Sequence, residues 1–323
     1  MKKIAVFTSG GDAPGMNACV RAVVRTALYH NIEVVGIRRG YRGMIDGDFV
    51  PMTSYSVSNI IGQGGTILKS ARCDEFRDIK WRKVAYDNCV KEGIEGLVAI
   101  GGNGTFTGAE LLMENFGIPT IGCPGTIDND LYGTDYTIGF DTAVNTALDA
   151  IDKIRDTAAS HDRVFFVEVM GRDAGFIAMQ CGIGGGAEKI LVPENPDSID
   201  DVIGTLKSGG EKEKPSHIVV VAEGEEIGNA HFIAQKAKEA LPNLDIRVSN
   251  LGHIQRGGSP SAIDRIIASR MGIAAVEGLL KGKNNVMSGI IDDKVVYTSF
   301  NDAINKKKAL DVDLIKMVKI LNS

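Results

Sequence analysis

The sequence lacks a cysteine pattern, a long apolar run and an excess of positive charge. Its five cysteines are scattered, with no CxxC pair and no histidine at zinc spacing, so reduced thiols are favoured over a zinc module or a disulfide framework. No apolar run approaches 18 residues, so no transmembrane helix is expected. The formal net charge of −5 argues against a general nucleic-acid binder, although a local cluster of arginines could still bind a small anion.

Signals for secretion and for the commonest nucleotide sites are missing too. The first residues, MKKIAVFTSGGD, turn polar too early for a signal-peptide core, so we expect a cytoplasmic protein with no membrane partner. No GxxxxGK[ST] motif is present, which excludes a Walker-type site. The letters GIGGGA at 182–187 match the dinucleotide fingerprint, but the strand-like KILVP follows instead of a helix, so we interpret them as a chance match.

Glycine, by contrast, is abundant, and short β-branched runs recur along the chain. Of the 323 residues, 39 are glycine, where average composition is ~7% glycine. The runs are almost continuously apolar, as expected for strands buried on both faces of a parallel sheet. They are KIAVFTS, EVVGIR, GLVAIGG, PTIGCPG, RVFFVEVMG, KILVPE, HIVVVAE and IRVSNLG. Helical periodicity over 142–156 and 260–281 completes an α/β pattern with a mainly parallel sheet.

Three details refine this expectation. Ser259 is expected to cap the helix over 260–281, with Pro260 at its first position. The segment NVMSGIIDDKVVYTSF, with DD at its turn, predicts an antiparallel hairpin. Two domains are expected, because the strands divide naturally near the long helix at 142–160.

Four glycine-rich loops follow predicted strands: SGGDAPGMN, IGGNGTFTG, CPGTIDNDLYGT and VMGRDAGF. Ligands of a doubly wound sheet bind outside the carboxyl ends of its strands, so we expect these loops together on one sheet edge. Three of them precede a helical pattern, whose free N–H groups and positive dipole end attract anions. One such loop can be a plain turn, but four indicate a phosphate-binding site.

Charged side chains in or near these loops suggest phosphoryl chemistry. Asp128 and Asp130 lie two residues apart, so an extended segment would point both to the same side. Such a pair could bind a divalent cation, or one of the two could act as a general base. Alternatively, the carboxylates could only stabilise a turn through Asx hydrogen bonds. Glu223 ends a buried strand and could accept hydrogen bonds from sugar hydroxyls. Cationic candidates for phosphate oxygens are Arg72, Arg163, Arg172, Arg247, His253 and Arg256.

The ordered set TSGGDAPGMN, SAR, GGxGT, PGTIDND, VEVMGR, GHIQRGGSP and ASRMG resembles the bacterial ATP-dependent 6-phosphofructokinases over essentially the whole chain. The resemblance implies transfer of the ATP γ-phosphoryl group to the 1-hydroxyl of fructose 6-phosphate, giving fructose 1,6-bisphosphate in glycolysis. It also implies Mg²⁺, a homotetramer, and two doubly wound, mainly parallel α/β domains with the active site in the cleft between them. Residues 1–139 plus 252–304 would bind the nucleotide, and residues 140–251 plus 305–323 the sugar phosphate.

The resemblance also implies roles for individual residues. Asp128 would take the sugar hydroxyl proton, with Thr126 beside it, while Arg72, Arg172 and Gly11 would stabilise the transferring group. Implied ATP contacts are Gly11, Tyr41, Arg72, Cys73, Arg77, Gly102, Asn103, Gly104, Thr105 and Gly108. Implied sugar-phosphate contacts are Thr126, Asp128, Asp130, Arg163, Met170, Gly171, Arg172, Glu223, Arg247, His253 and Arg256, with Arg163 and Arg247 supplied by a neighbouring subunit.

Two positions bear on the phosphoryl donor and the metal. Pyrophosphate-using relatives usually have Asp at the position of Gly104 and Lys at that of Gly125, so the two glycines favour ATP. The family usually has a Mg²⁺-binding Asp where this chain has Asn103, which leaves Asp130 as the main anionic support for the metal. We therefore expect both substrates to bind but turnover to be slow.

An allosteric anion site is also implied, at Arg21, Arg25, Arg155, Glu188 and Lys214. Ser54 and Ser216 stand where basic residues are common, so we expect a weak or altered effector response. Two other functions stay open: a pyrophosphate-dependent kinase, and a catalytically weak regulatory subunit that binds both ligands.

Overall fold

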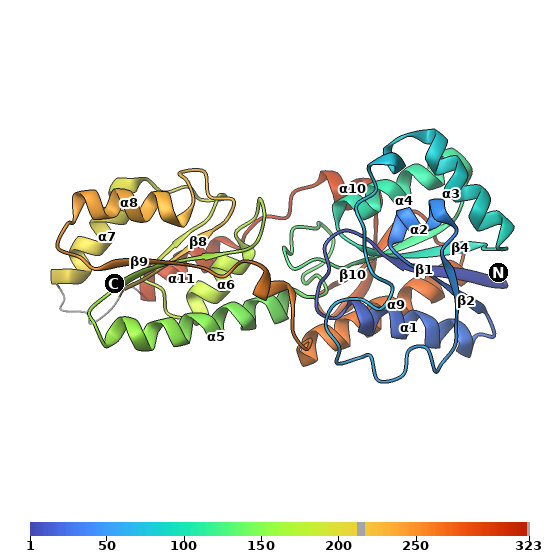
Figure 1. Ribbon diagram of the computed structural model, residues 1–323, viewed down its shortest axis with the longest axis horizontal. Coiled ribbons are helices and arrows are strands. Elements are labelled where there is room, and N and C mark those ends of the chain that lie inside the picture. Colours follow the sequence, from blue (N-terminus) through green and yellow to red (C-terminus); the bar gives the residue numbers. More distant parts are fainter. Residues whose placement is uncertain (212–216, 322–323) are drawn as a thin grey trace. The chain divides into compact units, whose positions relative to one another are not determined.

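The computed structural model describes residues 1–211 and 217–321, in two compact units (Figure 1). Unit 1 comprises Met1–Ile127, Leu131–Thr142 and Arg256–Lys308. Unit 2 comprises Asp128–Asp130, Ala143–Gln255 and Ala309–Ser323. Each unit has its own sheet, and the chain passes between them within helix α5 (Phe140–Ala159).

Unit 1 is built on a seven-stranded sheet in the order β11-β10-β5-β4-β1-β2-β3. Its strands are β1 (Lys3–Thr8), β2 (Glu33–Ile37), β3 (Phe49–Met52), β4 (Gly96–Gly101), β5 (Thr120–Pro124), β10 (Val286–Ile291) and β11 (Lys294–Ser299). The five inner strands are parallel, and only the edge strands β3 and β11 are antiparallel to their neighbours. β4 and β5 are buried at every residue, which explains their continuous apolar sequences.

Helices cover both faces of this sheet. They are α1 (Met16–Tyr29), α2 (Gly40–Asp46), α3 (Ile79–Lys91), α4 (Asn103–Phe116), α9 (Ala262–Leu280) and α10 (Phe300–Asn305), with the short 3₁₀ turn η1 (Asp74–Arg77). A second 3₁₀ turn, η2 (Gly252–Arg256), lies where the chain returns from unit 2 to unit 1. α1 and α9 pack together on one face, while α2, α3 and α4 lie on the other (Figure 1). Phe7, Ile37 and Leu97 belong to the core beneath α2, α3 and α4.

Unit 2 has an all-parallel four-stranded sheet in the order β7-β8-β6-β9. Its strands are β6 (Val164–Val169), β7 (Lys189–Leu191), β8 (His217–Ala222) and β9 (Ile246–Asn250). Its other helices are α6 (Phe176–Gly184), α7 (Ile199–Glu211), α8 (Ala230–Ala240) and α11 (Val312–Leu321). α7 and α8 cover one face and α5 and α6 the other (Figure 1).

The α/β class, the mainly parallel strands and the terminal hairpin are confirmed. Asp292 and Asp293 both have positive φ angles between β10 and β11, as a two-residue hairpin turn requires. The letters GIGGGA end α6 and lead into β7, so they do not open a helix.

The prediction of four glycine loops on one sheet edge is wrong. Three of the loops follow β1, β4 and β5 in unit 1, but VMGRDAGF follows β6, which pairs with β8 and β9 in the separate sheet of unit 2. A buried apolar run does not indicate which strands it pairs with, so the sequence could not separate the two sheets.

The predicted cap of the helix over 260–281 is also wrong. The N-cap of α9 is Ser261, whose Oγ accepts a hydrogen bond from the Asp264 N–H at 3.2 Å. Ser259 instead donates its hydroxyl to the Gly62 carbonyl. The helix therefore begins two residues later than the Ser-Pro signal indicated.

Replacement of the cap should destabilise unit 1. We expect Ser261→Ala to lower the free energy of unfolding by about 1 kcal/mol, because an N–H at the start of α9 loses its acceptor. Ser259→Ala is the matched control and should change it by less than ~0.5 kcal/mol. Denaturant unfolding monitored by circular dichroism measures both, and an equal loss in the two variants would contradict the assignment.

Candidate functional site

Three strands of unit 1 end side by side and bring three predicted loops together. β1 lies next to β4, and β4 next to β5. Beyond the strand ends, the Ser9 N–H donates to the Ile100 carbonyl and the Gly125 N–H to the Gly101 carbonyl, each at 3.0 Å. The first residues of these loops are therefore fixed to one another by main-chain bonds.

The loop after β4 opens directly into α4. Gly102 is the N-cap and Asn103 the first helical residue, so the main-chain N–H groups at the start of α4 lie beside the ends of β1 and β5. A Cβ on Gly102 would lie 3.7 Å from the Thr126 Cβ, which places Thr126 next to this helix start. A Cβ on Gly104 would meet no atom within 4 Å, so this position faces open space. These features suit a phosphate group.

Tyr41 supports this helix start from the protein interior. Its ring is only 5% exposed and stacks on Phe76 with centroids 4.0 Å apart. Its hydroxyl donates to the Thr105 carbonyl, and a Cβ on Gly108 would lie 2.7 Å from the ring. Burial raises the pKa of Tyr41 well above its usual value, so the hydroxyl stays a donor. Tyr41 thus fixes the first turns of α4.

The segment before α3 contains the remaining predicted nucleotide contacts. Arg72 and Arg77 are exposed, and Arg77 lies 3.7 Å from the Asp74 carboxylate. Cys73 is half-buried, and burial is the largest cause that raises the pKa of its thiol. The Arg42–Glu75 ion pair lies beside it.

The structure brings Gly11 and Arg256 together, although the sequence assigned them to different ligands. A Cβ on Gly11 would lie only 2.5 Å from Arg256 Nη1, so a side chain at this position would require the guanidinium group to move. Arg256 Nη1 also donates to the Asp12 carbonyl at 3.3 Å. Arg256, the last residue of η2, therefore places its guanidinium group against the loop after β1. His253, on the same turn, is exposed.

In unit 2 the two predicted carboxylates lie close enough to interact. Burial raises the pKa of Asp130, the neighbouring Asp128 carboxylate raises it further, and Arg172 opposes both. Asp128 itself is 8% exposed. Two acidic groups and one guanidinium group thus share one environment, which plain turn chemistry does not require.

Arg172 is held by the end of a neighbouring strand. Its N–H donates to Glu223 Oε1 at 2.9 Å, and the Glu223 N–H donates to the Val169 carbonyl at 3.0 Å. Because β6 and β8 are adjacent and parallel, Met170–Arg172 and Glu223 meet at the carboxyl end of this sheet. Met170 is buried, while Arg172 is exposed.

Arg163 and Arg247 lie at the opposite end of the unit 2 sheet from Met170, Arg172 and Glu223. Arg163 precedes β6 and Arg247 is the second residue of β9, so both lie at the amino end of the sheet. Arg163 precedes the six residues of β6, which at ~3.3 Å each put roughly 20 Å between its main chain and the strand end before Arg172. Arg247 pairs with Phe165, about 13 Å from that end. Both arginines bind Asp245, with Arg163 Nε 2.7 Å and Arg247 Nη2 3.0 Å from its carboxylate oxygens. Sequence reasoning missed Asp245, which the spacing D-I-R could have indicated.

Residues of the predicted effector site fall in both units. Arg21 and Arg25 lie on α1 in unit 1, whereas Arg155 and Glu188 lie in unit 2 with Nη1 and Oε1 3.9 Å apart. Arg155 Nη2 also donates to the Gly185 and Gly186 carbonyls at 2.6 and 2.8 Å. Lys214 and Ser216 lie outside the described residues.

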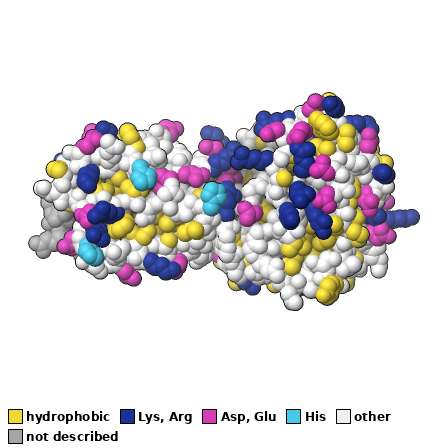
Figure 2. Space-filling view, in the orientation of Figure 1, with side chains coloured by type: hydrophobic (Ala, Val, Ile, Leu, Met, Phe, Trp, Pro, Cys, Tyr) yellow, Lys and Arg dark blue, Asp and Glu magenta, His cyan; other side chains and the backbone are white. Residues whose placement is uncertain are grey.

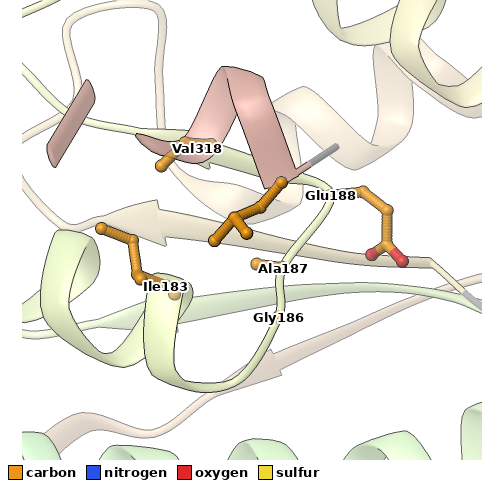
Figure 3. A pocket seen from close by; sticks show the side chains of 7 residues that line it. Ile183, Gly186, Ala187, Glu188 and Val318 are labelled. Carbon is orange, nitrogen blue, oxygen red and sulfur yellow. The ribbon is translucent and has the colours of Figure 1, made fainter. Parts of the chain in front are cut away.

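A cavity of about 180 Å³ adjoins Glu188. It lies between the α6–β7 loop and α11, with Ile183 and Val318 among its lining residues (Figure 3). The bonds from Arg155 to the Gly185 and Gly186 carbonyls fix one wall of this cavity.

Basic and acidic side chains are interspersed over the visible faces of both units (Figure 2). In residues 1–211 and 217–321, no helix has both the length and the apolar character needed to span a membrane. Within the same residues, no group of three or more His, Cys, Asp or Glu side chains is arranged to hold a metal ion.

Comparisons with known proteins identify the family of this chain. The sequence matches the phosphofructokinase family over residues 3–279. It is 62% identical to the ATP-dependent 6-phosphofructokinase of Cytophaga hutchinsonii, covering 100% of this chain and 98% of that one. Identity to ATP-dependent 6-phosphofructokinase 1 of Thermus thermophilus is 57%, over 99% of both chains.

Solved structures share the fold. The Pichia pastoris phosphofructokinase in the T-state superimposes with a TM-score of 0.88 at 34% identity, and this chain spans 99% of its own length but 37% of that longer chain. A pyrophosphate-dependent phosphofructokinase from Marinobacter aquaeolei gives a TM-score of 0.86 at 25% identity, over 100% of this chain and 92% of that one. The fold is thus common to both donor types. The chain belongs to the phosphofructokinase family, among the bacterial ATP-dependent 6-phosphofructokinases.

Proposed function

We propose that this chain transfers the γ-phosphoryl group of ATP to the 1-hydroxyl of fructose 6-phosphate, giving ADP and fructose 1,6-bisphosphate in cytoplasmic glycolysis. The observation that carries the proposal is the shared environment of Asp128, Asp130 and Arg172. Phosphoryl transfer needs positioning, cations and one base, and this group combines a base with a cation.

In the proposed reaction, Asp128 accepts the proton of the sugar 1-hydroxyl as its oxygen attacks the γ-phosphorus. The bond from the γ-phosphorus to the β–γ bridging oxygen breaks, and ADP leaves. Arg172 and the exposed Arg72 neutralise charge on the equatorial oxygens, while Gly11 lets the main chain approach the transferred group. Thr126, 8% exposed, stands beside Asp128.

The main-chain N–H groups at the start of α4 are proposed to bind the nucleotide phosphates. Gly102, Asn103 and Gly104 would supply them, and Gly104 borders open space that an aspartate would fill. This space supports ATP as the donor. Gly125 is less informative, because a Cβ there would already lie 3.0 Å from Met16 Cε and 3.1 Å from Ile100 Cγ2, in the core.

Mg²⁺ is proposed to be held by Asp130, with Asn103 as a weaker, uncharged oxygen donor. Carboxylates that repel each other, one of them with a pKa raised by burial, are groups that a divalent cation would stabilise. When bound, the metal would neutralise charge on the β- and γ-phosphates.

Sugar-phosphate binding is proposed to require a second subunit. Glu223 would accept bonds from sugar hydroxyls, and Met170, Gly171, His253 and Arg256 would surround the substrate. Within one chain, Arg163 and Arg247 lie at the opposite end of the sheet from Arg172, about 20 Å and 13 Å of strand away, which supports their donation to a neighbour's site in a homotetramer. The proposed nucleotide domain is 1–139 plus 252–304, and the proposed sugar-phosphate domain is 140–251 plus 305–323.

The base can be tested directly. We expect Asp128→Asn to lower kcat by roughly 10²–10⁴-fold, because the hydroxyl proton loses its acceptor. A coupled assay of fructose 1,6-bisphosphate formation measures it, with ATP and then pyrophosphate as donor. Asp149→Asn, at an exposed position of α5, is the control and should be unaffected. Faster turnover with pyrophosphate would support the pyrophosphate-dependent alternative instead.

The second alternative, a catalytically weak subunit that binds both ligands, depends on Asn103. We expect Asn103→Asp to raise kcat at saturating Mg²⁺ by on the order of 10²–10³-fold, because a carboxylate at the start of α4 restores a preorganised contact to the metal. Asn31→Asp adds the same charge at the amino end of β2 and serves as control. An unchanged rate in Asn103→Asp would show that Asn103 does not limit turnover.

Effector response is proposed to be weak. Titration of phosphoenolpyruvate against the fructose 6-phosphate saturation curve should shift the apparent affinity by less than the roughly 5-fold lower end of typical allosteric coupling. The reason is the loss of positive charge at Ser54 and Ser216. Strong sigmoidality would contradict the prediction.

A further inference from the structure

Buried hydrogen bonds fix the start of the loop that carries Asp128. This loop leaves β5 at Pro124, and its later part returns to the same strand end. There the Ile138 N–H donates to the Pro124 carbonyl at 2.8 Å, and Gly125 and Ile138 form a parallel bridge. Beside that bridge, the Thr137 hydroxyl donates to the Thr126 carbonyl at 2.6 Å.

Thr137 is completely buried, so its hydroxyl cannot exchange this bond for one to bulk water without a rearrangement. Thr126 lies two residues before Asp128. Constraint of the Thr126 carbonyl fixes the peptide plane between Thr126 and Ile127, and Ile127 is also fully buried. The direction in which the chain enters Asp128 therefore depends on Thr137.

The segment with Thr137 is anchored in turn by Asp264 of α9, a carboxylate with 0% exposure. Asp264 Oδ1 accepts the Gly139 N–H at 2.8 Å. Its Oδ2 accepts the Thr142 N–H at 2.8 Å and also the Thr142 hydroxyl. The Ser261 N–H donates to Thr142 Oγ1 at 2.9 Å, which closes the network. The three groups that hydrogen-bond to the Asp264 carboxylate are all donors, so each of its oxygens acts as an acceptor.

We propose that Thr137 is a positioning residue for phosphoryl transfer, which holds the main chain that leads into Asp128 and is itself anchored through Asp264. The proposal rests on the proposed role of Asp128 as base. Thr137 need touch neither substrate. It acts by keeping the base within reach of the sugar hydroxyl, where a displacement near 1 Å can cost about 10²-fold in rate.

The test compares Thr137→Val with Thr120→Val. Valine keeps the shape of threonine and removes only the hydroxyl. Thr120 lies at the other end of β5, is also completely buried, and donates its hydroxyl to the Ile118 carbonyl at 3.3 Å. Thr120→Val therefore removes the same kind of buried hydroxyl, but at a position away from Asp128. We expect Thr137→Val to lower kcat roughly 10–100-fold with KM for ATP and fructose 6-phosphate nearly unchanged, and Thr120→Val to leave both constants near wild type.

Rescue and folding controls complete the design. Thr137→Ser keeps the hydroxyl and should recover most of kcat. A wild-type kcat in Thr137→Val, an equal loss in Thr120→Val, or no recovery in Thr137→Ser would each overturn the proposal. Circular dichroism melting shows whether the variants fold. If Thr137→Val does not fold, Thr142→Val is the alternative, because it weakens the anchor of the Thr137 segment on Asp264. This variant should lower kcat without raising KM, and a wild-type kcat would overturn the proposal.

The wild-type chain separates this proposal from the proposed function. If the wild type does not form fructose 1,6-bisphosphate from ATP, the proposed function fails. If the wild type and Asp128→Asn turn over equally, Asp128 is not the base and the positioning role fails with it. If only Asp128→Asn is inactive while Thr137→Val is fully active, the function stands and the positioning role fails.

Discussion

Main-chain crowding at the carboxyl ends of β1, β4 and β5 is the constraint on which the other features of unit 1 depend. A Cβ on Gly101 would lie 2.5 Å from the Ser9 carbonyl oxygen and 2.3 Å from Thr105 Oγ1. Three loops can therefore leave the sheet at one place only if the residue between them has no side chain. The same closeness aligns the start of α4 with the ends of both neighbouring strands, which makes a set of N–H donors available to one anion.

The two units contribute different kinds of charge. Unit 1 offers helix N–H groups and the Arg256 guanidinium group, packed so closely on Gly11 that any side chain there would displace it. Unit 2 offers carboxylates. Asp128 raises the pKa of Asp130, and the Glu223 carboxylate accepts a hydrogen bond from the Arg172 N–H. In the proposed reaction, N–H donors and cations would stabilise the phosphate charge and a carboxylate would receive the proton.

Asn103 lies where the resemblance to the family leads us to expect a Mg²⁺-binding aspartate. It is the first residue of α4, where a carboxylate would be favoured by the helix dipole. A neutral amide keeps the shape of the helix start but removes a negative charge that a hard cation prefers. Such a change can alter catalysis without altering the fold, which is consistent with the high similarity to the structures of other phosphofructokinases.

Local features of this protein followed from the sequence, because each depends on residues close together in the chain. Continuous apolar runs predicted the buried parallel strands, and the DD turn predicted the hairpin of β10 and β11, since buried strands and two-residue turns have strong local signatures. The motif resemblance predicted the family, because its segments are long and correctly ordered. The proximity of Asp128 and Asp130 also follows from their spacing.

Other features were decided only by tertiary structure. Strand pairing assigned the loop after β6 to a second sheet, and packing placed Arg256 against Gly11, 245 positions away in the sequence. Asp245 joined Arg163 to Arg247, and Asp264 reached Gly139 and Thr142 across more than 120 residues. These contacts arise from how sheets and helices pack, and the free energy of such packing depends on pairs of distant residues that no local pattern in the chain records.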